Sequence, residues 1–188
     1  MKIPVKKLGA RVLDFDIENR PLSYWADRPT AEVTAIAACW VDDPKTMQVW
    51  ILGRDDPLDM LDDFRVMFAQ AGMVTGHYIR KHDLPILSGA SQELRGVSLP
   101  AVLTEDTKLD LVKRGDLPAT QEFLSDMMGL KAKKVGMSQA MWREANRLTK
   151  KGLELTEARV RGDVLQHMKL RVALREAGLL RPPRMWYP

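Results

Sequence analysis

The sequence predicts an α/β domain with a mixed sheet of about five strands flanked by helices. Strand-like segments fill the first part of the chain, strands and helices then alternate, and the last part contains only helix-like segments. With 188 residues, 45% of them hydrophobic, the chain can bury one sizeable core but is short for two. We therefore expect one domain over residues 1–188, with a proline-rich tail at 181–188.

Five segments have the composition and patterning of strands. They are residues 13–17, 32–41, 47–52, 73–75 and 103–107. The connections among the first three contain Pro and Asp, so we expect an antiparallel meander there. The fourth and fifth strands are expected to be parallel, and the strand that begins at Leu13 should be central in the sheet.

Helices are expected between and after these strands. Pro57 can begin one, and apolar residues follow at helical spacing up to Gly72. A second helix begins at Asp83, because Pro85 is tolerated only in a first turn. The remaining helices are expected at 109–114, 120–128, 138–147 and 156–177, whereas the tail at 181–188 cannot be helical.

Charge is distributed unevenly along the chain. Residues 1–94 contain 11 Lys and Arg against 14 Asp and Glu, although the whole chain carries a formal net charge of +4. The second half is therefore basic, which suits a polyanionic partner beside an acidic centre, although solvated lysines on helices would give the same composition.

The single cysteine, Cys39, excludes an internal disulfide and a cysteine-rich zinc site. The chain has no secretion signal and no apolar segment of membrane-spanning length. We therefore expect a cytoplasmic protein in a reducing compartment, with no membrane partner.

Asp16 and Glu18 lie two residues apart in the strand-like stretch 11–21, so their side chains share one face, while Phe15 and Ile17 point to the other. Neighbouring carboxylates are costly to bury unless a positive charge lies between them. Mg²⁺ or Mn²⁺ would provide that charge, because both prefer oxygen ligands. A solvated strand is the alternative, and Asp14 on the same face favours it. This segment alone leaves both interpretations open.

Three further segments fit an acidic metal centre assembled from distant parts of the chain. Asp83 ends the run from Gly76 and begins a helix, Asp106-Thr107 closes the fifth strand, and Asp163 lies in a helix that is otherwise basic and apolar. Together with Asp16-Ile-Glu18, these motifs resemble in order and spacing those of the DnaQ-like (DEDD) 3′→5′ exonucleases, which have the RNase H-like fold. The resemblance covers most of the chain.

The resemblance implies an RNase H-like sheet and an acidic quartet, Asp16, Glu18, Asp83 and Asp163, that binds two divalent ions. Such ions, about 3.5–4 Å apart, clamp the scissile phosphate of a nucleic acid. By this resemblance Asp16 would be the shared ligand, Glu18 and Asp163 would complete the site of the attacking water, and Asp83 would hold the second ion.

The chain departs from the family at the residue that orients the attacking water. A Tyr or His is usual four or five residues before the last Asp, but this chain has Arg159 and Ala158 there. His167, one helical turn after Asp163, is a candidate substitute, as is His82, although each can equally be a packing or surface residue. Arg159 can pair with Asp163 in the absence of metal, or contact the scissile phosphate.

Several basic residues are candidates for binding a nucleic-acid backbone. They are Arg80, Lys81, Lys131, Lys133, Lys134, Arg143, Arg147, Lys150 and Lys151. Each could instead be a solvated surface residue, but their grouping favours a phosphate-binding surface.

The sequence therefore predicts a metal-dependent nuclease, in the simplest case a 3′→5′ exonuclease on single-stranded DNA. A structure-selective endonuclease such as a Holliday-junction resolvase is the alternative within enzymes, and a non-catalytic nucleic-acid-binding module is the alternative outside them. The expected partner is single-stranded or branched DNA, with RNA as a further candidate. The protein would be a monomer, or a homodimer if it cuts two strands symmetrically.

Overall fold

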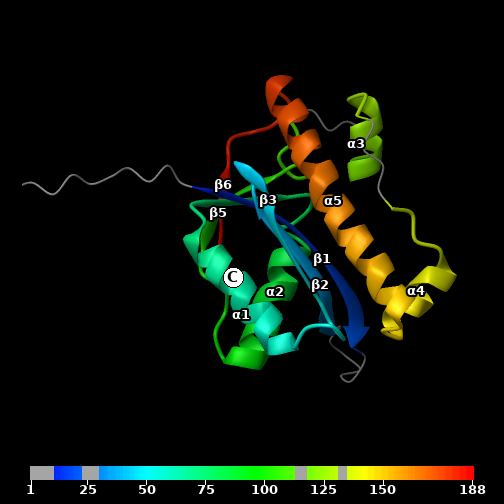
Figure 1. The fold of residues 1–188 in the computed structure, drawn as a ribbon. Helices are drawn as coiled ribbons and strands as arrows, with labels where there is room; N and C mark the ends of the chain where they lie inside the picture. Colours follow the sequence, from blue (N-terminus) through cyan, green and yellow to red (C-terminus); the bar gives the residue numbers. More distant parts are fainter. Residues whose placement is uncertain (1–10, 23–29, 113–117, 131–134) are drawn as a thin grey trace, which may run out of the picture.

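A computed structural model describes residues 11–22, 30–112, 118–130 and 135–188. Six strands form one mixed sheet in the order β3-β2-β1-β4-β5-β6 (Figure 1). The strands are β1 (Val12–Leu22), β2 (Thr30–Trp40), β3 (Asp43–Ile51), β4 (Met73–Gly76), β5 (Val102–Asp106) and β6 (Arg184–Trp186). The first three form an antiparallel meander, β4 and β5 continue parallel to β1, and β6 is antiparallel to β5.

This arrangement confirms the predicted α/β class, the RNase H-like sheet, the meander and the central position of β1. The expected strand count of five is wrong, because the tail adds β6 at the sheet edge. Pro182 and Pro183 prevent the tail from forming a helix, and the three residues after them pair with β5. A three-residue strand is too short to show an alternating pattern in sequence.

The five described helices lie on both faces of the sheet (Figure 1). They are α1 (Pro57–Gln70), α2 (Asp83–Arg95), α3 (Gln121–Met127), α4 (Gln139–Asn146) and α5 (Lys150–Glu176). Helices α1 and α2 cover one face, and α5 crosses the other with α3 and α4 beside it. Among the helices of the described ranges, none is both long and apolar enough to cross a membrane.

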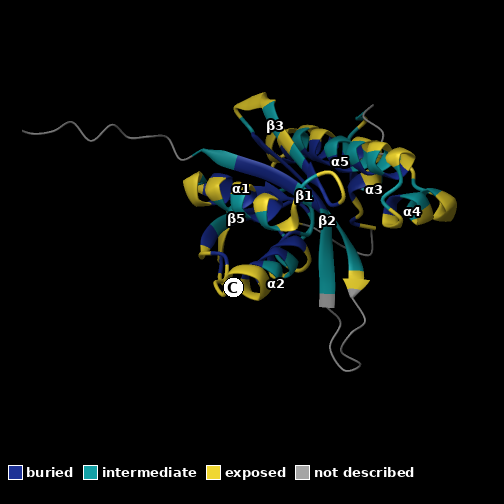
Figure 2. Ribbon diagram, turned by 60° about the horizontal axis from the view of Figure 1, so that its bottom comes forward, coloured by how far each residue is buried: buried dark blue, intermediate teal, exposed yellow. Residues whose placement is uncertain are grey.

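The larger core lies between the sheet and helices α1 and α2. Phe15 and Ile17 of β1 point into it, as their alternation predicts, and Phe15 meets Phe64 of α1 edge to face with ring centroids 5.2 Å apart. Trp186 of β6 is buried in the same core. Figure 2 shows the central strands buried and the outer sides of the helices exposed.

Small side chains on β2 let α5 approach the other face. Ala35, Ala37 and Cys39 are fully buried there, packed with Val160 and Val164 of α5. Alternate residues of β2 face the larger core instead. The short side chains leave room for polar groups on the neighbouring strand β1, between the sheet and the helix.

Two predicted helices differ from the structure. The helix expected at 109–114 is absent over residues 109–112, and residues 113 and 114 lie outside the described ranges. One turn closes from the Asp110 N–H to the Asp106 carbonyl, but the Val112 N–H donates to the Leu179 carbonyl. The Asp106 carboxylate also accepts the N–H groups of residues 108 and 109, so side-chain bonds replace those of a helix.

Helix α5 begins at Lys150, six residues before the expected start. The expected start was too late because Gly152 lies in the first turn of α5, and glycine is unfavourable in a helix. The structure explains the glycine: a β-carbon at this position would lie 2.1 Å from the Glu144 carbonyl oxygen. Gly152 therefore allows the backbones of α4 and α5 to touch.

Candidate metal centre

Three acidic side chains of β1 point toward α5. Asp14, Asp16 and Glu18 alternate with the core-facing residues, so all three share the α5 side of the sheet. Their partners across the β1–β2 pair are Cys39, Ala37 and Ala35. Residues directly opposite in an antiparallel pair share a face, so the acids are flanked by small side chains.

Helix α5 presents a matching set of polar side chains. Arg159, Asp163 and His167 are spaced four residues apart and therefore share one face of the helix. Four helical residues advance about 6 Å and two strand residues about 6.6 Å, so the two sets can stay in register. Arg159 meets Glu18, Asp163 faces Asp16 and Glu18, and His167 meets Asp14.

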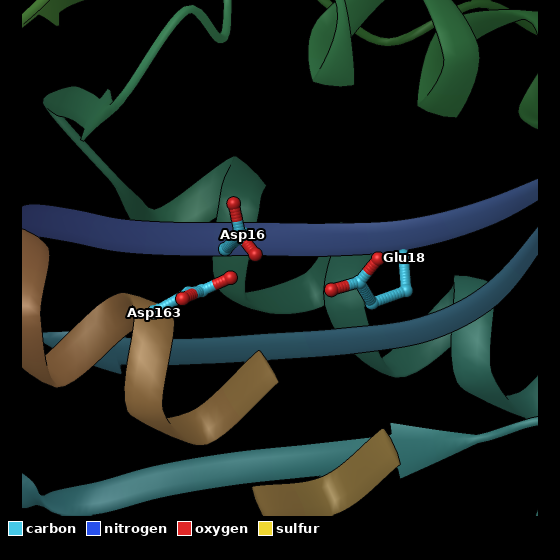
Figure 3. Close-up of side chains that lie close together, drawn as sticks. All are labelled: Asp16, Glu18 and Asp163. Carbon is cyan, nitrogen blue, oxygen red and sulfur yellow. The ribbon is translucent and has the colours of Figure 1, made fainter. Parts of the chain in front are cut away.

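The middle of this contact is an acidic cluster formed by Asp16, Glu18 and Asp163 (Figure 3). One carboxylate oxygen of each residue lies within 4.8 Å of the others. Asp163 is buried, whereas Asp16 and Glu18 are partly exposed. Carboxylate oxygens at this spacing fit Mg²⁺ or Mn²⁺, so the cluster can bind a divalent metal ion. Figure 3 shows the three side chains converging from β1 and α5.

Arg159 takes part in this cluster. Its Nε lies 2.9 Å from Asp163 Oδ2 and 3.1 Å from Glu18 Oε1, and its Nη1 donates to the Val135 carbonyl at 2.8 Å. The predicted pairing of Arg159 with Asp163 is therefore present, and Glu18 shares the guanidinium. The guanidinium supplies positive charge between two carboxylates that would otherwise repel each other.

At the inner end of the contact, His167 and Asp14 form a buried pair. His167 Nδ1 lies 2.8 Å from the Asp14 carboxylate, and its Nε2 lies 3.1 Å from the Thr107 hydroxyl. The same hydroxyl lies 3.0 Å from His77 Nδ1. Burial raises the pKa of Asp14, and the adjacent His167 opposes that shift. Because Asp14 is fully buried, the solvated-strand interpretation is wrong at this position.

Asp83, the fourth predicted ligand, begins α2 beside the same strand but is not a member of the acidic cluster. Strand β4 pairs with β1 only as far as Asp14, so the Ile17 N–H lies past the end of β4. Asp83 Oδ1 accepts that N–H at 3.2 Å, and its Oδ2 lies 3.2 Å from His82 Nδ1. In this structure Asp83 therefore anchors α2 to β1.

The two histidines considered as bases occupy different environments. Both ring nitrogens of His167 are within hydrogen-bond distance of buried side chains, and 3% of its side chain is exposed. The His82 side chain is 45% exposed. Its hydrogen bond with Asp83 raises the pKa of His82, and the Glu18 carboxylate contributes to this shift. Of these two side chains, His82 is the one with substantial solvent exposure.

The predicted nucleic-acid-binding residues fall into separate groups. Arg80 is largely buried and pairs with Asp110, so its guanidinium is occupied within the protein. Lys81 is exposed. Four exposed basic residues, which we call the basic corner, lie where α4 ends and α5 begins: Arg143, Arg147, Lys150 and Lys151. Lys131, Lys133 and Lys134 lie outside the described residues.

The basic corner lies at the Glu18 end of β1. Arg20, two residues beyond Glu18, donates to the carbonyl of Asn146, the last residue of α4, at 2.9 Å. The basic corner and Glu18 therefore lie near the same end of β1.

Sequence reasoning missed the buried partners of His167. In the sequence, Asp14 only favours the solvated-strand alternative, and Asp106-Thr107 is a segment of the predicted centre in which neither the Thr107 hydroxyl nor His77 has a role of its own. A signal was available for Asp14: the period-two spacing of 14, 16 and 18 in β1 matches the period-four spacing of 159, 163 and 167 in α5. Nothing comparable in the sequence links Thr107 and His77 to them.

No family model matches the sequence, and no curated protein matches it significantly. Solved structures match by fold. The family B DNA polymerase of the hyperthermophilic archaeon Pyrobaculum calidifontis aligns with a TM-score of 0.62 and 20% identity, over 88% of this chain and 24% of the polymerase. The chain shares its fold with part of a family B DNA polymerase.

Two structures of Phi29 DNA polymerase match in the same way. The complex with single-stranded DNA gives a TM-score of 0.56, and the ternary complex with primer-template DNA and incoming nucleotides gives 0.55, both at 10% identity. Each alignment covers 92% of this chain, but 33% and 32% of the polymerase chains. The chain therefore spans about a third or less of the polymerases that it resembles.

Proposed function

We propose that the protein is a divalent-metal-dependent nuclease, in the simplest case a 3′→5′ exonuclease on single-stranded DNA. The observation that carries the proposal is the acidic cluster, in which carboxylates of β1 and α5, far apart in sequence, come within 4.8 Å. The similarity to DNA polymerases, one of them complexed with single-stranded DNA, supports a nucleic-acid substrate. The DnaQ-like resemblance of the motifs points to hydrolysis of phosphodiester bonds.

The proposed roles follow from the positions of the side chains. Asp16, Glu18 and Asp163 would hold a Mg²⁺ or Mn²⁺ ion, and Asp83 would contribute to a second site. A bound divalent ion lowers the pKa of a coordinated water and stabilises charge on the phosphate. His82, whose side chain is 45% exposed and contacts Asp83, would accept the proton of the attacking water, while His167 holds Asp14 and so fixes β1 against α5.

The basic corner would bind the strand that leads to the cleavage site. Lysine and arginine bind backbone phosphates without reading sequence, which suits a nuclease with little sequence preference. Arg143, Arg147, Lys150 and Lys151 are exposed at the Glu18 end of β1, and Lys81 precedes the helix that carries Asp83.

One observation favours a second candidate, a non-catalytic nucleic-acid-binding module. Clustered carboxylates without a metal normally destabilise a fold, but Arg159 lies between Glu18 and Asp163 and supplies positive charge there. A metal-free cluster is therefore compatible with a stable fold, and only activity separates the two candidates.

The decisive experiment digests end-labelled single strands, duplexes and four-way junctions in parallel, with Mg²⁺ or Mn²⁺ and with EDTA. We expect stepwise shortening of the single strand from its 3′ end with metal, and none with EDTA. Asp16→Asn should lower the rate by about 10³-fold or more, because the cluster loses a negative ligand, while single-strand affinity stays near that of the wild type.

The outcomes separate the candidate functions. Paired cuts near the branch of the junction would replace the exonuclease with a resolvase. Binding without cleavage under every metal condition would leave the binding module. Equal activity of the wild type and Asp16→Asn would show that the acidic cluster is not the active site. Lys169→Gln, which changes an exposed side chain outside the cluster, is the matched control and should cleave at the wild-type rate.

A further inference from the structure

Arg159 lies inside the acidic cluster. Its side chain is 15% exposed, equal to that of Glu18, and its Nε contacts carboxylates from both β1 and α5. The carbonyl of Val135 accepts its Nη1. Three acceptors on three segments therefore fix the guanidinium, so it is not a surface arginine that samples many positions.

The charges show what this position implies. The three carboxylates of the cluster carry three negative charges and Arg159 carries one positive charge. The four side chains together therefore have a net charge of −2. One divalent ion neutralises that remainder, whereas two ions would leave the group positive. A metal ion and a guanidinium in the same partly buried group also repel each other, because both are positively charged. They would compete for the same carboxylates, Glu18 and Asp163.

We propose that Arg159 is a resident counter-ion that competes with divalent metal for Glu18 and Asp163. This inference rests on the proposed function and assigns a role to the residue that stands where the DnaQ-like pattern has a Tyr or His. Without metal, Arg159 holds the cluster together. When metal binds, the guanidinium gives up these contacts, and the metal affinity of the centre is lower because of this exchange.

The first test measures Mn²⁺ binding by calorimetry at constant pH for the wild type, Arg159→Met and Arg161→Met. Methionine keeps an unbranched apolar stem and removes the charge. Arg159→Met should bind Mn²⁺ about tenfold or more tightly than the wild type, since changes beside a metal ligand commonly alter affinity by about 10- to 100-fold. In EDTA its melting temperature should fall, and Mn²⁺ should raise that temperature more than in the wild type.

Arg161→Met is the matched control. Arg161 lies on the same helix and pairs with Glu157, four residues away, outside the acidic cluster. Its replacement should leave Mn²⁺ affinity at the wild-type value. A tenfold change in this control as well would assign the effect to the general charge of α5 and would overturn the specific role of Arg159.

The second test needs no variant, so it also applies if Arg159→Met does not fold. The Nε–H resonance of Arg159 is followed by NMR in the wild type during a Mg²⁺ titration. It should shift or broaden together with the backbone amides of Asp16 and Glu18 as the guanidinium leaves its carboxylates. An unchanged Arg159 signal while those amides respond would overturn the inference.

The outcomes for this inference and for the proposed function are distinguishable. Equal Mn²⁺ affinity in the wild type and Arg159→Met, with binding detected in both, overturns the competition and leaves the metal centre intact. If neither the wild type nor Arg159→Met binds Mn²⁺, the proposed metal centre is wrong, and the proposed competition is wrong as well. Tighter binding by Arg159→Met, with an unchanged control, supports both.

Discussion

The two ends of the contact between β1 and α5 pair an acid with a base in the same way but in different surroundings. At the inner end, the side chains of Asp14 and His167 are 0% and 3% exposed. At the outer end, those of Glu18 and Arg159 are each 15% exposed, and Arg159 also contacts Asp163. The same spacing along β1 and α5 produces the pair at each end. The two pairs therefore differ in solvent exposure, not in how the strand and the helix bring them together.

This difference separates a structural pair from a candidate functional one. A carboxylate without access to water must find its partners inside the protein, and Asp14 does so in His167. A carboxylate at the rim can exchange a protein partner for an ion or a water. Burial therefore suits the inner end to holding the sheet and helix together, and partial exposure suits the outer end to binding.

The largest effect on stability is expected at the inner end. His167→Leu removes the imidazole that contacts the buried Asp14 carboxyl group at 2.8 Å, so the free energy of unfolding should fall by about 3–5 kcal/mol. Urea denaturation at neutral pH measures it. The double variant Asp14→Val with His167→Leu removes both polar groups and should be more stable than the single variant. A loss below about 1 kcal/mol in the single variant would remove the distinction between the two ends.

A smaller effect is expected near the outer end. Replacing Lys150 and Lys151 with Gln should weaken binding to single-stranded DNA and reduce the salt dependence of log K by about 1.4, since each phosphate contact contributes about 0.7 on single strands. Fluorescence anisotropy at several KCl concentrations measures the slope. Lys169→Gln is the control and should leave the slope unchanged. If the double variant behaves like this control, the basic corner is not the binding surface.

The smallest effect concerns Cys39, which lies opposite Asp14 on β2. Burial raises the pKa of its thiol to about 12, and the Asp14 carboxylate adds to the shift. The thiolate that reacts with disulfide reagents is therefore scarce at pH 8. We expect no reaction of the native protein with Ellman's reagent, and complete reaction in denaturant. Rapid labelling of the native protein would show that the inner end opens readily.

Much of the fold was predictable because its signals are local. Alternating side chains identify the strands of the meander, and Pro57 and Asp83 begin the helices as expected. The features that were missed depend on contacts between distant segments. Gly152 looks like a helix breaker until Glu144 is placed against it, and the Val112 N–H turns away from a helix toward Leu179.

The candidate site shows the same division. The resemblance of the motifs to those of the DnaQ-like exonucleases implies Asp16, Glu18 and Asp163 as ligands, and the structure brings these three side chains together. The sequence places Asp83 in the same quartet, whereas in the structure its carboxylate binds the Ile17 N–H at the end of β4. The burial of Asp14 depends on three elements, its own strand β1, the neighbouring strand β2 and helix α5, so no pattern within one strand could have predicted it.

The matched rise of helix and strand limits how this centre can change over evolutionary time. Inserting one residue into α5 between Asp163 and His167 would turn the remainder of the helix by about 100° and take one end of the contact out of register. A substitution, by contrast, changes a single contact and leaves its neighbours aligned. We therefore expect descendants of this chain to alter the chemistry of the centre by exchanging side chains, while insertions and deletions accumulate in the connecting loops.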